Sequence, residues 1–270
     1  MRRITTYLIL LLCLFGCGPN GAANSKGPAH ADTGVVADDN AGSAAVRATA
    51  SRSAPVIAVL IDFTQSISTY GVELPTVETL KPLVDLIDKY GGELAIGSIE
   101  ENPRMPLLRL RLDPPEAPPT PPSTSSDVFT RNKLMRAYRK DREAHEAREE
   151  ARRARNAEQI TVYLNRIEGL LRQGATAGST DVWGSLRRAE TFLMEDPTSW
   201  ASTPLRFALL VTDGRHNVTS STYKPPDPSI TVLVATGSKA IGDLTRLDPP
   251  PRWFESASGA IRFIVTNVEE

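Results

Sequence analysis

The chain of 270 residues is long for one domain and short for two, because domains usually run to about 100–200 residues. Its 31 basic and 32 acidic residues nearly balance, which excludes a strong overall field that would attract nucleic acid or a membrane surface. An apolar content of 40% together with 21 prolines indicates a folded core combined with segments outside that core.

Residues 1–16 have the layout of a secretory signal peptide: two arginines, then an apolar run too short to span a bilayer, then a small residue. The stretch LFGC resembles the lipobox of bacterial lipoproteins. This resemblance implies cleavage before Cys17 and attachment of lipid, such as palmitate, to Cys17. An uncleaved signal anchor and an ordinary signal peptide are the alternatives. Both cysteines, Cys13 and Cys17, lie here, so the rest of the chain can form no disulfide.

The sequence after Cys17 bears on where the protein is held. Gly18 stands where an aspartate would resemble an inner-membrane retention signal, which favours the outer membrane in a cell with two membranes. Residues 17–53 are mostly small and polar and cannot bury enough surface to offset the entropy of ordering. We therefore expect a lipid anchor in the cell envelope and a disordered tether that links it to a folded domain over residues 54–270.

The domain begins with PVIAVLID, an apolar run typical of a strand buried on both faces. Residues 75–92 have apolar side chains at helical spacing and end on two glycines, although Pro82 predicts a kink or a late start. ELAIGSI predicts a second strand. In PLLRLRLD, leucines alternate with Arg109 and Arg111, as in an exposed edge strand.

A proline-rich linker is expected over residues 113–126, followed by a long charged helix over 127–173. Apolar residues become dense only near the end of that helix, so its last turns should pack on the domain while its middle lies in solvent. A coiled-coil partner is the alternative, but alanine is a weak seam residue.

Beyond this insertion, a glycine-rich loop leads into an amphipathic helix that is expected to start at Asp181. PLRFALLV and SITVLVA predict two further buried strands, and RWFES a short sixth. In the final segment, the spacing of Ile261, Ile264 and Val268 favours a helix, whereas the β-branched content favours a strand. Strands that alternate with helices predict an α/β fold with an open, mostly parallel, doubly wound sheet of about six strands.

Oxygen-bearing side chains stand at the predicted carboxyl ends of the strands. Asp62, Thr64 and Ser66 follow the first strand at steps of two, Thr180 lies in the glycine-rich loop, and Asp213 follows the fourth strand. Open α/β sheets bind ligands at these ends, where the strand order reverses. Two carboxylates and three hydroxyls suit Mg²⁺, Mn²⁺ or Ca²⁺ and disfavour zinc.

The three motifs DFTQS, STD and TDG resemble, in this order, the metal-ion-dependent adhesion site (MIDAS) of von Willebrand factor type A (vWA) domains. The resemblance covers about residues 55–270 and implies the strand order 3-2-1-4-5-6. It also implies that Asp62, Thr64, Ser66, Thr180 and Asp213 hold the metal, and that a partner protein fills its open position with an Asp or Glu carboxylate. Thr64 replaces the usual serine, and the proline-broken segment after TDG predicts the loss of one family helix.

Each motif also has a purely structural interpretation. Asp62 and Ser66 can cap a loop or a helix, Thr180 can cap the next helix, and Asp213-Gly214 can be an ordinary turn. His216 is interpreted as a surface-loop residue and Trp183 as a helix anchor. No phosphate-binding lysine loop, nucleophile elbow or histidine triad is present, so we do not expect an enzyme.

Together these features predict a membrane-tethered, extracytoplasmic protein-binding lipoprotein that uses a divalent metal for adhesion and does not bind nucleic acid. A metal-free scaffold whose charged helix mediates interactions is the alternative.

Overall fold

A computed structural model describes residues 53–100, 105–123, 127–174, 176–195, 203–219, 221–237 and 242–270. The expected signal peptide, Cys17 and nearly all of the expected tether lie outside these residues. Contacts divide the chain into two units, Met1–Arg47 and Ala48–Glu270, and every described residue belongs to the second. Within the described ranges, no helix has both the length and the apolar character that crossing a bilayer requires.

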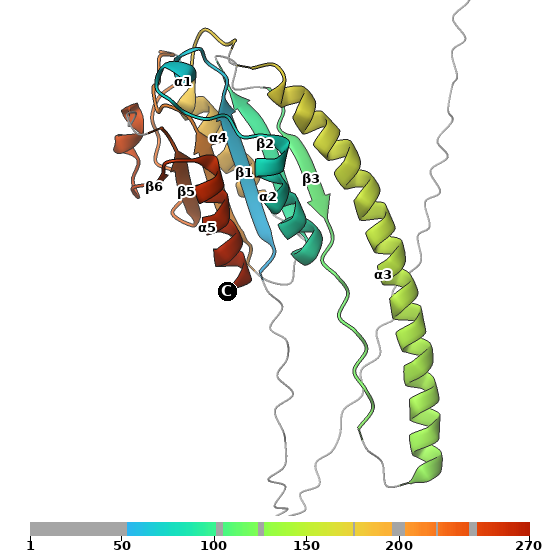
Figure 1. The fold of residues 1–270 in the computed structure, drawn as a ribbon. Coiled ribbons are helices and arrows are strands. Elements are labelled where there is room, and N and C mark those ends of the chain that lie inside the picture. The colour runs from blue at the N-terminus through green and yellow to red at the C-terminus, as the bar shows by residue number, and fades with distance from the viewer. Residues whose placement is uncertain are drawn as a thin grey trace, which may run out of the picture. The chain divides into compact units, whose positions relative to one another are not determined.

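The described residues form one sheet of six strands in the order β3-β2-β1-β4-β5-β6 (Figure 1). All neighbouring strands pair in parallel except β3, which runs antiparallel to β2 at the sheet edge. The expected α/β fold with an open, mostly parallel sheet is therefore confirmed, as is the strand order. The strands are β1 (Pro55–Asp62), β2 (Gly92–Ile99), β3 (Leu108–Leu112), β4 (Leu205–Val211), β5 (Ile230–Ala235) and β6 (Arg252–Phe254).

Helices cover both faces of the sheet (Figure 1). On one face lie α2 (Val77–Tyr90), α5 (Ala257–Glu269) and the C-terminal part of α3 (Val128–Leu171). On the other lie α4 (Val182–Leu193) and the short 3₁₀ helix η1 (Gly242–Arg246). Alternate residues of β1 enter the two cores, because successive side chains of a strand point to opposite faces. Ile57, Val59 and Ile61 join the first core, and Val56, Ala58 and Leu60 the second.

The position of β1 explains why every one of its residues is apolar until Asp62. All eight residues of β1 are buried, with β2 on one side and β4 on the other. The parallel pairing places Ile61 beside Val211. The strands β1 and β4 therefore end at the same edge of the sheet, and the residues that follow them emerge next to each other.

Two expectations about helices are settled by packing. The final segment is a helix, α5, because its apolar residues at steps of three and four bury one continuous stripe, and its β-branched residues do not prevent this. The hydroxyl of Ser256 caps α5 by accepting a hydrogen bond from Gly259 N at 3.3 Å. Of the two alternatives expected from Pro82, a kink or a late start, the late start is wrong, because α2 begins at Val77, capped by Thr76, and continues through the exposed Pro82.

The 44 residues of α3 correspond to about 66 Å of helix, and only Asn156, Tyr163 and Ile167 are buried. All three lie within its last 16 residues, beside β3 and α2, as expected for packing by the last turns. The N-terminal part of α3 extends away from the sheet (Figure 1). We call residues 128–155, together with the extended segment 113–123, the arm.

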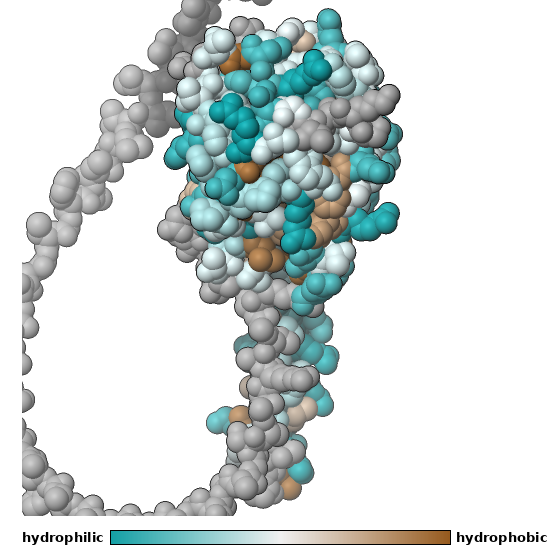
Figure 2. Space-filling model, turned by 90° about the vertical axis from the view of Figure 1, so that its left-hand side faces the viewer, coloured by the Kyte–Doolittle hydropathy of each residue, from teal (hydrophilic) through white to brown (hydrophobic). Residues whose placement is uncertain are grey.

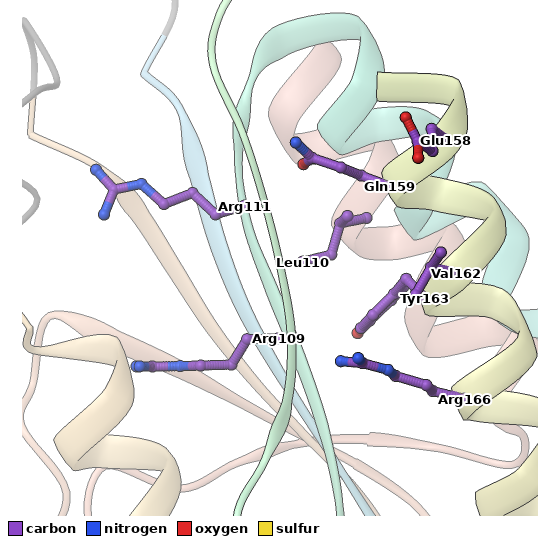
Figure 3. Close-up of a pocket in the computed structure, with 8 residues that line it drawn as sticks. All are labelled: Arg109, Leu110, Arg111, Glu158, Gln159, Val162, Tyr163 and Arg166. Carbon is purple, nitrogen blue, oxygen red and sulfur yellow. The ribbon is translucent and has the colours of Figure 1, made fainter. Parts of the chain in front are cut away.

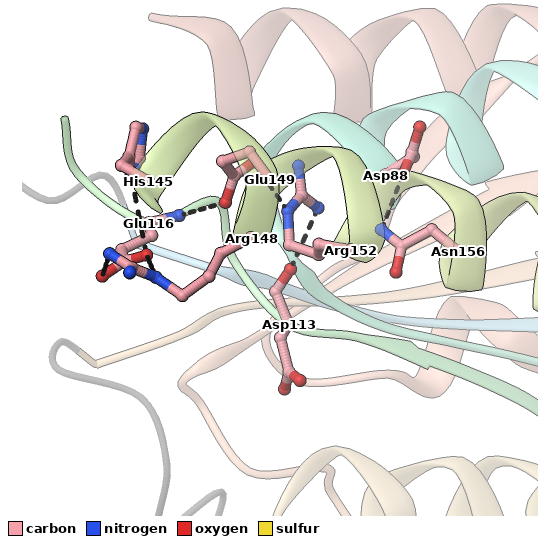
Figure 4. A network of polar contacts seen from close by, with 8 residues as sticks. All are labelled: Asp88, Asp113, Glu116, His145, Arg148, Glu149, Arg152 and Asn156. Atoms are coloured by element: carbon pink, nitrogen blue, oxygen red, sulfur yellow. Dashed lines mark hydrogen bonds and ion pairs between the residues drawn. The ribbon is translucent and has the colours of Figure 1, made fainter. Parts of the chain in front are cut away.

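The proline-rich segment was expected to be a linker, but its first residues lie against α3 (Figure 4). Glu116 pairs with Arg148 at 2.8 Å, and its backbone N donates to the Glu149 carboxylate at 2.9 Å. Arg152 donates to the backbone oxygen of Asp113 at 3.5 Å. The prolines keep this segment extended without backbone hydrogen bonds of its own. The polar groups of its other residues can therefore pair with α3.

Candidate metal centre

The first candidate segment curls tightly over the end of β1. Thr64 donates to Asp62 Oδ1 twice, from its backbone N at 2.9 Å and from its hydroxyl at 2.7 Å. The hydroxyl oxygens of Thr64 and Ser66 lie 3.1 Å apart. Ser66 also begins the short helix α1 (Ser66–Thr69). The three oxygen-bearing side chains therefore converge at one place, as their alternate spacing predicts.

The glycine-rich loop is joined to this turn by backbone pairing. Ala177 N donates to Phe63 O at 3.0 Å, and Gln65 N donates to Ala177 O at 3.4 Å. Three residues later, Thr180 is buried. No hydrogen bond or ion pair within the described ranges links its hydroxyl directly to the other four candidate ligands. The pairing at Ala177 nevertheless brings its loop to the same edge of the sheet.

Thr180 is also fixed from the other side, by Asn217. Thr180 N donates to Asn217 Oδ1 at 2.6 Å, and Asn217 N donates back to Thr180 O at 3.2 Å. Asn217 lies four residues beyond Asp213, so this reciprocal pair connects the loops that carry Thr180 and Asp213. Asn217 was not among the predicted site residues, because nothing in its local sequence distinguishes it from any other polar loop residue.

The third segment places Asp213 beside Asp62. The hydroxyl of Thr212 donates to Asp62 Oδ2 at 2.7 Å and accepts from Gly214 N at 3.0 Å. Gly214 has a φ of 76°, a backbone conformation that favours glycine after the aspartate. Arg215 N donates to Asp213 Oδ1 at 3.0 Å. Thr212 was also missed, although its place directly before Asp213 was a usable signal.

The electrostatics of this edge are unusual, because two buried carboxylates lack a cationic partner. Asp62 and Asp213 are both fully buried. No ion pair within the described ranges involves either one, and Asp213 Oδ2 is a buried oxygen for which these residues supply no hydrogen-bond donor. Burial raises the pKa of Asp62, the hydrogen bonds from Thr64 and Thr212 lower it, and the charge of Asp213 raises it further.

This donor set fits a divalent cation held by oxygen. The two carboxylates supply negative charge, the hydroxyls supply neutral oxygens, and Asp213 Oδ2 is an acceptor that meets no donor among the described residues. No group of three or more His, Cys, Asp or Glu side chains that could hold a metal occurs in the described part of the chain. Direct contacts unite Asp62, Thr64 and Ser66; Asp213 joins them through Thr212, and Thr180 through its loop.

A second polar cluster lies directly behind this edge. Asp181 caps α4 by accepting from Gly184 N at 2.8 Å, and it accepts a hydrogen bond from the hydroxyl of Ser221. His216 is not the surface residue expected from the sequence: its side chain is 12% exposed and its ring centroid lies 5.8 Å from that of Trp183. The Ser221 hydroxyl donates to Asp181 and lies 3.5 Å from His216. In a catalytic serine–histidine–aspartate triad the serine donates to the histidine and the histidine to the aspartate, so this cluster has a different arrangement.

The segment between β4 and β5 forms no helix among its described residues, as expected from its prolines. Instead, Tyr223 packs edge-on against Trp183, with ring centroids 5.0 Å apart. Trp183, which is buried in the second core, thereby acts as the expected helix anchor, and Tyr223 packs against the same core.

A cavity of about 270 Å³ lies away from this centre, between β3 and α3 (Figure 3). Figure 3 shows Tyr163 and Arg166 projecting from α3 toward β3, while Arg109 and Arg111 point away from that helix. Arg109 is engaged with Glu195 at 2.5 Å and Glu93 at 3.6 Å. The basic side chains at this cavity therefore do not converge on a common ligand.

No protein-family model matches the chain, and no curated protein matches it. Among solved structures, the chain is similar to the pilus adhesin SpaC from Lactobacillus rhamnosus GG, with 12% identity and a TM-score of 0.41, covering 80% of this chain and 30% of that one. It is also similar to proximal thread matrix protein 1 (PTMP1) from the mussel byssus, with 12% identity and a TM-score of 0.36, covering 80% of this chain and 47% of that one. The chain thus spans less than half the length of either protein, and similarity at this level carries no argument about function.

Proposed function

We propose that this chain is a vWA-like, lipid-anchored binding protein of the cell envelope that holds a protein partner through a divalent cation. The observation that carries the proposal is the pair of fully buried carboxylates, Asp62 and Asp213, which have no cationic partner among the described residues and are accompanied by hydroxyl oxygens. Burying two such charges costs several kcal/mol unless a cation or protons compensate them.

The five proposed ligands would offer two kinds of oxygen to the ion. Thr64, Ser66 and Thr180 are proposed to offer neutral hydroxyl oxygens, and Asp62 and Asp213 to offer charge. Mg²⁺, or alternatively Mn²⁺ or Ca²⁺, would supply a Lewis-acidic position for an Asp or Glu carboxylate of the partner. Such a bond is strong because the mostly neutral ligands leave part of the positive charge uncompensated. The proposed function is binding rather than catalysis, and it involves no nucleic acid.

A second candidate function is a metal-free scaffold in which the arm mediates interactions. The projection of α3 beyond the sheet favours this candidate, because most of the arm is exposed and contributes nothing to the two cores.

Melting temperatures with Mg²⁺ and with a chelator separate the two candidates. The wild type should gain stability with Mg²⁺, by about 2.7 kcal/mol at an ion concentration 100 times the dissociation constant. Asp213→Ala should lose this gain, and with chelator it should melt no lower than the wild type, since it removes a buried charge. Asp85→Ala, at an exposed carboxylate paired with Lys81, is the matched control and should respond like the wild type. A wild type indifferent to Mg²⁺, Mn²⁺ and Ca²⁺ would favour the scaffold.

A further inference from the structure

The distal end of the arm exposes an unusual concentration of apolar side chains. Nine large hydrophobic residues are exposed in the described part of the chain, and four of them lie in residues 128–140. We call residues 128–140 the tip. The exposed fractions are 52% for Val128, 86% for Phe129, 40% for Leu134 and 37% for Met135. Figure 2 shows apolar (brown) and hydrophilic (teal) surfaces side by side at the lower end of the arm.

The tip is also strongly basic, whereas the helix behind it is not. Residues 128–140 contain no acidic residue and five basic ones, Arg131, Lys133, Arg136, Arg139 and Lys140. The next 13 residues, 141–153, contain four basic and five acidic residues. No ion pair within the described ranges involves any of the five basic residues of the tip, whereas Arg142 and Arg148 further along the arm are both paired. Among the described residues, the basic side chains of the tip are therefore unpaired.

Helical geometry sorts these side chains onto two sides. Because successive residues are about 100° apart, Val128, Leu134, Met135 and Tyr138 fall on one side of α3, with Arg131 among them and Arg139 at the border. Lys133, Arg136 and Lys140 fall on the other side, which also carries Phe129. Helices that lie flat in a membrane interface combine an apolar stripe with basic flanks, and most of the large apolar side chains of the tip share one such stripe. The 13 residues of the tip would cover about 20 Å of such a surface.

We propose that the tip of the arm binds an anionic lipid surface, with its axis parallel to the membrane. A second copy of the chain is a poorer occupant, because two tips of like charge repel each other. An acidic protein would match the charge, but the apolar stripe lies on a single exposed helix and forms no groove for its side chains. This site is separate from the candidate metal centre and does not depend on it.

Vesicle flotation tests the proposal with the chain that starts at residue 18, which excludes the leader and Cys17 but keeps every described residue. Both cores lie within Ala54–Val268 and are unaffected by this start. The protein should float with phosphatidylcholine vesicles that contain phosphatidylglycerol, and should not float with phosphatidylcholine alone. The triple variant Lys133→Gln, Arg136→Gln, Lys140→Gln should partition roughly 100-fold more weakly, since each basic residue near an anionic surface contributes about fivefold.

The matched control is the triple variant Arg153→Gln, Arg155→Gln, Arg166→Gln. These three arginines are also exposed and lie elsewhere on α3. The net charge changes by the same amount as in the first triple variant. Because the three arginines lie outside the tip, this control should float like the wild type. An equal loss in both triple variants would overturn the proposal, since overall charge would then explain the binding.

The apolar contribution has its own variant pair. Leu134→Ser with Met135→Ser should weaken flotation by about tenfold or more. Met105→Ser with Met194→Ser, at exposed methionines outside the arm, should not. Absence of flotation with anionic vesicles would overturn the proposal and leave an acidic protein as the occupant of the tip. Flotation that disappears with a chelator would also overturn it, because the binding would then belong to the metal centre.

Discussion

Asp62 and Asp213 are buried where β1 and β4 end side by side, so both carboxylates lose their bound water. Hydrogen bonds from protein groups replace only some of the lost bonds to water. Asp62 accepts from Thr64 and Thr212, but Asp213 Oδ2 meets no donor among the described residues. A fold that needed these residues only as turn formers would not bury both carboxylates, because exposed aspartates form turns equally well. The proposed role in binding a cation accounts for their burial.

The stability of the metal-free protein should depend on the protonation of Asp62. A carboxyl whose pKa is raised in the folded state binds its proton more tightly there, so its stabilising effect is present at low pH. With chelator present, this contribution should be lost as the pH rises from the ordinary value of 3.8 through the raised pKa. Urea unfolding at several pH values measures the free energy of unfolding. Asp62→Asn should reduce the fall relative to the wild type; an identical slope would contradict the prediction.

Thr212 links the two aspartates and should contribute to both the stability of the fold and the binding of the cation. Thr212→Val keeps the side-chain shape but removes the donor to Asp62 and the acceptor of Gly214 N. We expect a loss of about 1–3 kcal/mol in the free energy of unfolding and weaker Mg²⁺ binding, measured by urea unfolding and calorimetry. Thr161→Val, at an exposed threonine of α3, is the control and should change stability by less than about 0.5 kcal/mol. Equal effects of the two substitutions would show that Thr212 has no special role.

At the scale of elements, α3 combines an anchored end with a free end. Tyr163 and Ile167 are buried against the sheet, and the Tyr163 hydroxyl lies 3.3 Å from Leu94 O and 3.4 Å from Leu108 O. The part of α3 that precedes Asn156 contacts segment 113–116 mainly through exposed polar groups, and each of these contacts contributes little. The arm should therefore open locally without unfolding the domain.

Paired substitutions along α3 test this division. Ile167→Ala should lower the free energy of unfolding by about 2–5 kcal/mol, because it removes fully buried methyl groups from the first core. Leu134→Ala, in the exposed tip, should change it by no more than about 0.5 kcal/mol. Urea unfolding measures both. A large loss in Leu134→Ala would mean that the tip packs against something that stabilises the fold.

The proline-rich segment illustrates a limit of composition at this scale. Its prolines predict an extended chain, and the chain is extended. Composition does not predict that Glu116 and Asp113 lie along α3, since those contacts join residues more than 30 positions apart. Contacts that are distant in sequence also explain why the sequence did not decide between helix and strand for α5. The local preferences of this segment conflict, and burial against the sheet decides between them.

At the scale of the whole molecule, a lipid anchor is proposed to hold the domain at a membrane while the candidate metal centre faces a partner. Cys17→Ser should abolish incorporation of radiolabelled fatty acid and release the protein from the envelope fraction, because no other cysteine follows the leader. Labelling of wild-type cells followed by immunoprecipitation and fractionation measures both effects. Persistent label in the variant would contradict the lipid anchor.

The sequence by itself determined the α/β alternation, the buried strands β1, β4 and β5, the edge strand β3 and the long helix α3, because each depends on hydrophobic periodicity within a short window. It also singled out Asp62, Thr64 and Ser66, whose convergence follows from one tight turn. Only the tertiary structure decided how Thr212 and Asn217 bind the other loops together, and which of these side chains lack partners. Such contacts depend on the path of the whole chain, which brings residues 150 positions apart within hydrogen-bonding distance.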